Sequence, residues 1–178
     1  MAEAFSNKVA RAAGIVTSMT GGAIGITTNL ITGISTTSVA VNDLVDNGNY
    51  LLGTKVSSVG ASQVICDRDS TNTAAATAQN VKFLGVTTAY ASTGVKSILV
   101  GGTFANNTGN SVNLTVQIYD NSVTTEVALA AKIPVPNGSS FVISDTGKTV
   151  MEASDEIRIY CDSEGAIDAT LSILTGVS

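Results

Sequence analysis

Strict alternation of apolar and polar residues, interrupted by regular turns, is the feature of this sequence that most narrows its fold. It is plainest in residues 112–119, VNLTVQIY, and in residues 157–162, IRIYCD. A period of two residues places every apolar side chain of an extended strand on one face. These segments are therefore predicted to be β-strands with one buried and one polar face.

Seven segments of this kind follow one another in the second half of the chain. Clusters of Asn, Asp, Gly, Ser and Pro separate them, and these are the residues that tight turns favour. The predicted strands are 95–100, 112–119, 126–133, 140–144, 148–152, 156–162 and 167–174. Only 13% of residues are charged, and strong helix formers are sparse. We predict an all-β fold whose main part is an antiparallel β-sandwich, Ig-like or jelly-roll.

Residues 12–42 form the longest feature of the first half, because they contain no charged residue. Thr, Ser, Gly and Asn are too frequent here for a membrane helix, which needs about 20 predominantly apolar residues. Short extended pieces at 15–17, 23–27, 30–34 and 38–41 fit better. Such an arm suits a contact between subunits, but it could equally complete the sheet of its own domain. The residues predicted to be buried in an oligomer interface are Ile15, Val16, Ile24, Ile26, Leu30, Ile31 and Ile34.

The remaining segments of the first half complete the predicted organisation. Residues 2–13 have near-helical apolar spacing at Phe5, Val9 and Ala12. Short strands are predicted at 50–52, 55–59, 63–67 and 81–86, with a long loop at 68–80. The predicted domains are an extended N-terminal arm (1–37), a small β-hairpin module (38–90) and the β-sandwich (91–178).

Residues for common catalytic chemistry are missing or poorly placed. The chain has no histidine, so Ser-His-Asp and Cys-His nucleophile systems are excluded, and no glycine pattern matches a phosphate-binding loop. Paired carboxylates occur only as Asp155-Glu156 and as the group Asp162, Glu164 and Asp168. Acids in turns are ordinarily solvated or bonded to nearby backbone amides. We expect no catalytic residue and no cofactor.

Metal and disulfide chemistry has similarly weak signals. Asp67 and Asp69, or the group 162–168, could offer oxygen ligands to calcium, but neither matches an EF-hand loop, so no metal site is predicted. Cys66 and Cys161 are predicted to be reduced core thiols, with a disulfide between them as the alternative.

A sugar-binding surface would need an exposed aromatic platform. The chain has no Trp, and its tyrosines are Tyr50, Tyr90, Tyr119 and Tyr160. Tyr119 and Tyr160 alternate with the apolar residues of their strands, so they lie either on an exposed sheet face or in cross-strand packing.

The charge of the chain bears on its partners. The net charge of −5 lies entirely in residues 91–178, which hold nine acids and four bases, and no basic patch suits phosphate binding. Direct binding to nucleic acid is therefore not expected, and neither is a membrane span. No signal peptide is predicted, so synthesis in the cytoplasm is expected.

Two stretches resemble known proteins. Residues 38–67, SVAVNDLVDNGNYLLGTKVSSVGASQVICD, resemble a small β module of tailed-phage and prophage virion proteins. Residues 132–174, with KIPVPNGSSFVI, KTVMEASDEIRIYC and IDATLSIL, are similar to the end of small phage structural sandwiches, including those of marine and cyanobacterial phages. The resemblance implies a virion structural subunit at the capsid surface, neck or tail, and it transfers no catalytic residue.

These observations give a first hypothesis and an alternative. The first is a non-enzymatic structural subunit of a bacteriophage particle, made in the host cytoplasm, that forms a homo-oligomer and contacts other virion proteins. Low surface charge favours such packing, because copies repel one another little. The alternative is a carbohydrate- or cell-surface-binding β-sandwich module, similar to an adhesin.

Overall fold

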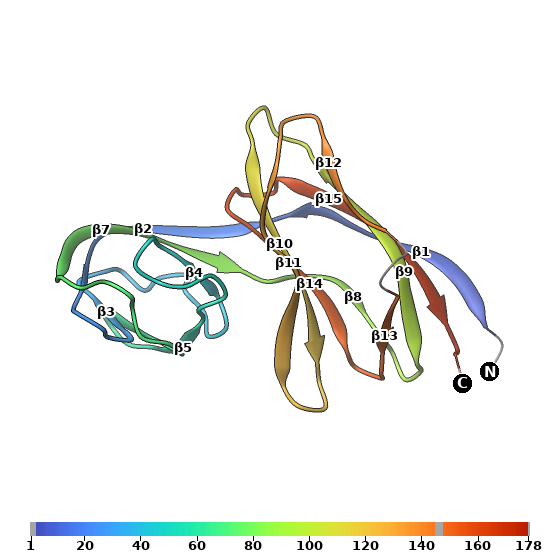
Figure 1. The fold of residues 1–178 in the computed structure, drawn as a ribbon, viewed down its shortest axis with the longest axis horizontal. Helices are drawn as coiled ribbons and strands as arrows, with labels where there is room; N and C mark the ends of the chain where they lie inside the picture. The colour runs from blue at the N-terminus through green and yellow to red at the C-terminus, as the bar shows by residue number, and fades with distance from the viewer. Residues whose placement is uncertain (1–2, 145–147, 178) are drawn as a thin grey trace. The chain divides into compact units, whose positions relative to one another are not determined.

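The computed structural model describes residues 3–144 and 148–177, and these residues form fifteen β-strands and no helix (Figure 1). The all-β prediction is thereby confirmed. The chain divides into two compact units. The sandwich unit comprises Met1–Gly14 and Thr87–Ser178, and the inserted unit comprises Ile15–Val86. In the described part of the chain, no helix is present that could cross a membrane.

The sandwich unit contains two antiparallel sheets. The first, sheet A, has the order β1-β15-β9-β12, and β13 also pairs with β9. The second, sheet C, has the order β11-β10-β14-β8. The strands of sheet A are β1 (Ala4–Ala13), β9 (Ser97–Asn106), β12 (Ser140–Ile143), β13 (Thr149–Met151) and β15 (Ile167–Thr175). Those of sheet C are β8 (Thr87–Ala91), β10 (Val112–Asp120), β11 (Thr125–Val135) and β14 (Glu156–Cys161).

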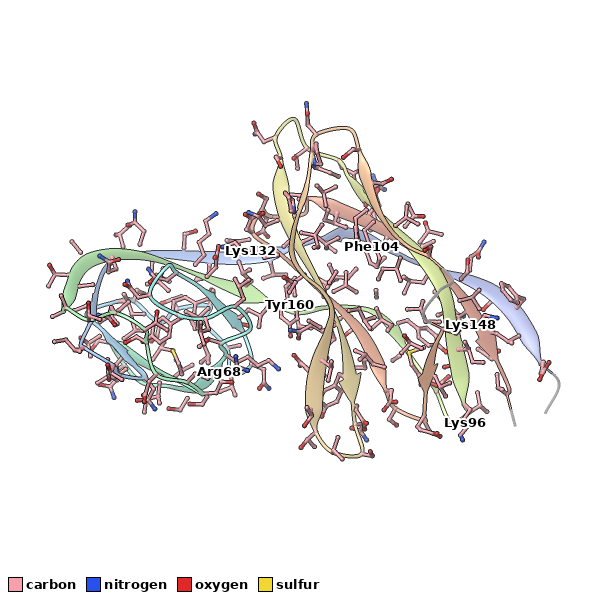
Figure 2. All side chains as sticks on the ribbon, viewed as in Figure 1. Arg68, Lys96, Phe104, Lys132, Lys148 and Tyr160 are labelled. Atoms are coloured by element: carbon pink, nitrogen blue, oxygen red, sulfur yellow. The ribbon has the colours of Figure 1, made fainter. Side chains whose placement is uncertain are left out.

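The core of the sandwich unit is built by the alternation that the sequence shows. Leu114 and Val116 of β10 are buried together with Ile157 and Ile159 of β14. Val116 pairs directly with Ile159, and Leu114 pairs with Cys161. Sheet A contributes Phe104 to the same core cluster (Figure 2). The predicted β-sandwich is therefore confirmed. All seven predicted strands are present, six of them within two residues of their expected bounds, while β9 continues six residues beyond the predicted end at residue 100.

The inserted unit is a six-stranded sheet that closes on itself. Its order is β4-β7-β2-β3-β6-β5. The strands are β2 (Ile15–Ile24), β3 (Leu30–Thr32), β4 (Leu44–Asp46), β5 (Val56–Val59), β6 (Gln63–Cys66) and β7 (Ala76–Gly85). The first and last strands are joined by backbone bonds from Val45 N to Thr54 O (2.8 Å) and from Val56 N to Asp43 O (2.9 Å). The closed sheet surrounds an apolar interior of its own.

Residues 2–13 were predicted to have helical spacing, and this prediction is wrong. Ala4–Ala13 form β1, which pairs with β15 from Ala4↔Thr175 to Ala13↔Ile167. Phe5 and Val9 are four positions apart, and four is also a multiple of the strand period, so both lie on one strand face. The pairing partner lies more than 150 residues away in sequence, where no local pattern could indicate it.

The structure divides the chain differently from the expected domains 1–37, 38–90 and 91–178. Residues 1–37 are not an extended arm, because β1 belongs to sheet A while β2 and β3 belong to the closed sheet. The module starts at Ile15 rather than at residue 38, and β8 belongs to the sandwich unit. The segments 38–41 and 50–52 are turns rather than strands, and β7 takes its first residues from the predicted loop 68–80.

The two ends of the insertion lie close together in each unit. In the sandwich unit, Gly14 N donates to Thr87 Oγ1 at 3.4 Å. In the inserted unit, Ile15 is paired with Gly85. Gly14 has φ +124°, and a Cβ atom there would lie 2.3 Å from the backbone oxygen of Ser163. Only glycine fits this junction.

Candidate interaction surface

The outward face of sheet A carries apolar side chains in cross-strand register. Along β15, Leu171 and Ile173 are buried in the core. The residues that alternate with them, Thr170, Ser172 and Leu174, therefore point outward. The register of the sheet places Phe5 opposite Leu174, Leu174 opposite Ile98, and Ile98 opposite Val150. Side chains directly opposite in antiparallel strands are about 4.5–5.5 Å apart at Cβ. They therefore form one row across four strands, named here the first row.

A second row crosses the same face. It joins Val9, Thr170, Thr103 and Val142, which are paired in that order. Between the two rows, Asn7 lies opposite Ser172 and Ser172 lies opposite Gly101. None of these residues is charged. We call the two rows and the residues between them the outer face of sheet A.

The large apolar side chains of this outer face are exposed. The exposed fractions are 65% for Phe5, 74% for Val9, 55% for Val142 and 55% for Val150. Single exposed apolar side chains are ordinary on protein surfaces, whereas contiguous ones mark contact sites. Register joins Phe5 to Val150 through Leu174 and Ile98 in the first row, whereas Thr170 and Thr103 lie between Val9 and Val142 in the second row.

Charged residues border the outer face at two ends. At one end, Lys96 Nζ lies 3.0 Å from Glu152 Oε1. At the other, Asp168 Oδ1 accepts a hydrogen bond from Ala12 N at 2.8 Å. That hydrogen bond, one from Asn107 and the nearby charge of Arg11 hold the pKa of Asp168 below its usual value. An uncharged centre with a charged border is the arrangement found in protein interfaces.

β1 adds an open strand edge to this surface. It is the terminal strand of sheet A and pairs with β15 on one side. Most of its ten residues are exposed. An edge strand presents main-chain donors and acceptors to any further strand.

The seven residues predicted to form an oligomer interface do not share one surface. All belong to the inserted unit, on β2, on β3 or beside them. Ile24, Ile31 and Ile34 lie in its interior, so they are unavailable for contacts while the unit is folded. Ile15 and Ile26 are exposed, and Val16 and Leu30 are partly buried. The interpretation that this stretch completes its own sheet, weighed equally from sequence, is the one that its strand pairing supports.

The acidic groups bind backbone amides within their own unit. Asp155 is buried and accepts from Asn121 N at 3.0 Å and from Glu152 N at 2.8 Å. Asp162 accepts from Asn113 N at 2.8 Å and from its Nδ2 at 2.7 Å. In the inserted unit, Asp67 accepts from Lys55 N at 2.8 Å. No cluster of three or more potential metal ligands occurs among the residues that the structure describes.

Tyr119 and Tyr160 take part in cross-strand packing rather than in an exposed platform. The guanidinium of Arg158 lies 3.8 Å from the ring centre of Tyr119. Arg158 Nε donates to Glu156 at 2.8 Å, and Arg158 Nη1 donates to Glu126. Glu126 also accepts from the hydroxyl of the buried Tyr160 at 3.2 Å. This cluster ties together β10, β11 and β14. Tyr50 and Tyr90 are buried as well.

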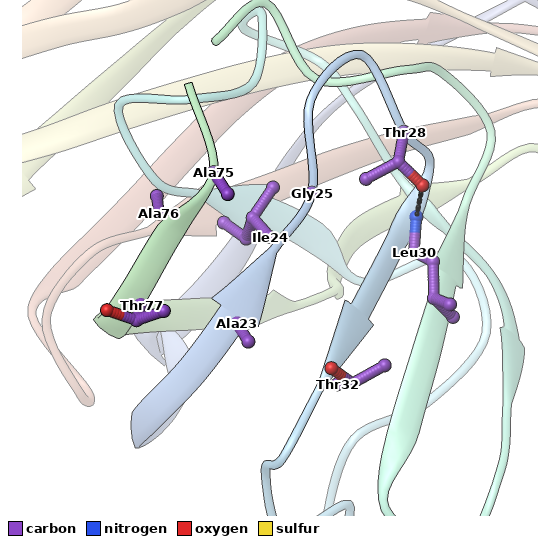
Figure 3. Close-up of a pocket in the computed structure, with 9 residues that line it drawn as sticks. All are labelled: Ala23, Ile24, Gly25, Thr28, Leu30, Thr32, Ala75, Ala76 and Thr77. Carbon is purple, nitrogen blue, oxygen red and sulfur yellow. Dashed lines mark hydrogen bonds between the residues drawn. The ribbon is translucent and has the colours of Figure 1, made fainter. Parts of the chain in front are cut away.

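Two hollows lie in the described part of the chain, one in each unit. One, of about 250 Å³, lies at the ends of β2, β3 and β7 (Figure 3). It is lined by Ala23, Ile24, Gly25, Thr28, Leu30, Thr32, Ala75, Ala76 and Thr77, and the Thr28 hydroxyl already accepts from Leu30 N at 3.2 Å. The other, of about 610 Å³, lies between β1 and β8, with Lys8 and Tyr90 among its lining residues. Neither lining includes a carboxylate or a cysteine.

The cysteines are free buried thiols in different units, as the reduced interpretation predicts. Burial raises the pKa of the Cys66 thiol to about 11, and a hydrogen bond with Tyr50 opposes part of this rise. The thiol is therefore protonated at neutral pH and unreactive in the folded unit.

Comparisons with known proteins add little to this geometry. No family model and no curated protein sequence matches the chain. Among solved structures, a chain of infectious bursal disease virus, Gx strain, is similar at 9% identity with a TM-score of 0.36, over 96% of this chain and 70% of that chain. Isomalto-dextranase of Arthrobacter globiformis T6, complexed with panose, is similar at 13% identity with a TM-score of 0.27, over 94% of this chain and 36% of that one. Both TM-scores lie below 0.5, so neither similarity carries a functional argument.

Sequence reasoning missed the outer face of sheet A. Its first row joins residues 5, 98, 150 and 174, and their neighbourhood depends on strand pairings between distant parts of the chain. Each residue alone is an ordinary member of an alternating strand. In β1, Ser6, Asn7 and Lys8 lie between Phe5 and Val9, so the sequence shows no alternation there, and a spacing of four fits a helix as well as a strand.

Proposed function

We propose that this chain is a non-enzymatic structural subunit of a tailed-phage particle, located at the capsid surface, neck or tail. It contacts copies of itself and other virion proteins. The observation that carries the proposal is the uncharged outer face of sheet A. There the apolar first row, and a second row that ends in the exposed Val9 and Val142, lie between charged borders. Contiguous exposed apolar surface of this kind favours burial against another protein.

Two further observations support the proposal. The stretches 38–67 and 132–174 resemble phage structural proteins, which supports a virion setting. The chain has no histidine, and the carboxylates of Asp155 and Asp162 accept hydrogen bonds from backbone amides. Both observations support a role without catalysis. The adhesin-like alternative has less support, because all four tyrosines are buried or packed against other side chains.

Immunogold electron microscopy tests the virion assignment. Phage particles are purified on a density gradient from a culture that produces the chain, and they are labelled with an antibody raised against it. We expect gold at one defined position on intact particles, and co-sedimentation of the chain with the particle band. Label-free particles, with the chain confined to the soluble fraction of the same lysate, would contradict the proposal.

A further inference from the structure

β1 has a sequence that is complementary to itself when two copies run antiparallel. In such a pairing, residues whose numbers add to 14 lie opposite one another, and Asn7 lies opposite Asn7 of the second copy. We propose that two copies of this chain pair through their β1 edges in this register, about a two-fold axis at Asn7. The inference rests on the proposed function, since it names the partner and the geometry of a self-contact.

The outward side chains match one another in this register. Phe5 lies opposite Val9 of the second copy, so two exposed apolar side chains cover each other on each side of the axis. Glu3 lies opposite Arg11 of the second copy, which places opposite charges together twice. Arg11 lies in the β-bulge of β1 between Ala10 and Ala13, and it is exposed and close enough to Asp168 for its charge to lower the pKa of that carboxyl. A symmetric dimer uses the same patch of both subunits, and β1 satisfies that requirement.

The same register joins the first row of one copy to the second row of the other. The first row of one copy ends at Phe5, and the second row of the other copy ends at Val9. Pairing Phe5 with Val9 makes them continuous, from Val150 of one copy to Val142 of the other. The outer faces of two sheets thereby become one uncharged surface.

Neighbouring registers fit less well. In the register whose numbers add to 16, Lys8 lies opposite Lys8 of the second copy, and like charges directly opposite are destabilising. In the register whose numbers add to 12, Phe5 lies opposite Asn7 and Glu3 opposite Val9. In the proposed register, Lys8 lies opposite Ser6 instead. A lysine on an edge strand usually discourages pairing. The proposed register avoids placing Lys8 opposite Lys8 of the second copy, and it also places Phe5 opposite Val9.

A cysteine at the axis tests the register. Asn7→Cys places two thiols opposite each other in a directly paired position, and the native thiols are buried. We expect a covalent dimer under mild oxidation on a non-reducing gel. Val127→Cys is the matched control, because Val127 is 58% exposed on β11, the edge strand of sheet C. An N7C variant that forms no more dimer than V127C would overturn the proposal.

Charge reversal tests the end pairs independently of the crosslink. Glu3→Lys or Arg11→Glu alone opposes like charges twice, and we expect each to raise the dimer dissociation constant about tenfold in sedimentation experiments. The double variant E3K/R11E restores opposite charges, so its dissociation constant should return toward that of the wild type. A double variant that dimerises no better than either single variant would also overturn the register. If wild-type association persists while both tests fail, self-association stands and this geometry does not.

Discussion

At the scale of single residues, buried acids and acids in turns accept hydrogen bonds from backbone amides. Asp43 is buried in the inserted unit, and its Oδ2 accepts from Ala40 N at 2.8 Å. Burial raises the pKa of Asp43 above its usual value of 3.8, and the hydrogen bond from Ala40 opposes part of this rise. The folded chain therefore holds this proton at a pH where the unfolded chain has lost it, and its contribution to stability falls as pH rises through that window.

Replacing the carboxyl of Asp43 tests whether its contribution to stability falls as pH rises. Asp43→Asn keeps a hydrogen-bond acceptor and removes the charge. Below about pH 3.8 both side chains are neutral, so the two proteins should be similarly stable. As pH rises through the folded pKa of Asp43, the free energy of unfolding of the variant should gain on that of the wild type. Urea unfolding from pH 3 to pH 7, followed by circular dichroism, measures the difference, and a difference that shrinks with rising pH would contradict the account.

The residue scale is also where sequence reasoning did best. Acids in turns were expected to bind nearby backbone amides, and Asp155 does so with Glu152 N. That expectation depends only on turn chemistry. Asp162 and Asp168 instead accept from Asn113 N and Ala12 N, which lie 49 and 156 residues away in sequence. The burial of Asp43 and the stacking of Arg158 on Tyr119 depend on residues distant in sequence, and no local pattern contains them.

At the scale of elements, the junction at Gly14 is the point where β1 ends and the chain leaves the sandwich unit. Gly14→Ala combines φ +124° with a Cβ atom 2.3 Å from Ser163 O, so we expect it to lower the free energy of unfolding of the sandwich unit by at least about 3 kcal/mol. Gly53→Ala is the control, since Gly53 has φ +82° but nothing within 4 Å of an added Cβ, and it should cost only about 1 kcal/mol in its own unit. Thiol labelling of Cys161 and Cys66 in urea reports the two units separately, because each unit holds one buried cysteine. Equal costs for the two variants would count against the steric explanation.

The strands of the sandwich could be predicted because their alternation is local. Residues 112–119 and 156–162 show the period of two directly, and β10 and β14 lie there. β1 and β8 were missed, because the largely exposed β1 carries no alternating pattern, β8 has only five residues, and both become strands through distant partners. Register is likewise non-local, and the outer face of sheet A exists only through register.

At the scale of the whole molecule, the inserted unit is an insertion between β1 and β8. Gly14 N and Thr87 Oγ1 are 3.4 Å apart, so joining Gly14 directly to Thr87 should leave the sandwich unit folded. A chain with residues 15–86 deleted should show a β-sheet circular dichroism spectrum, a cooperative thermal transition and a Cys161 thiol protected from labelling. A deletion chain with an exposed Cys161 would show that the sandwich unit depends on the insertion.

The central claim is that the chain associates with itself through sheet A, and native mass across a range of concentrations tests it most directly. The wild type is compared with Phe5→Lys/Val9→Lys on β1 and with the matched control Val123→Lys/Val127→Lys, which adds the same charge at similarly exposed valines near or on β11. We predict discrete oligomers for the wild type and the control, and a monomer with an unchanged circular dichroism spectrum for F5K/V9K. A wild type that stays monomeric at every concentration, or an F5K/V9K variant that associates as the wild type does, would contradict the claim.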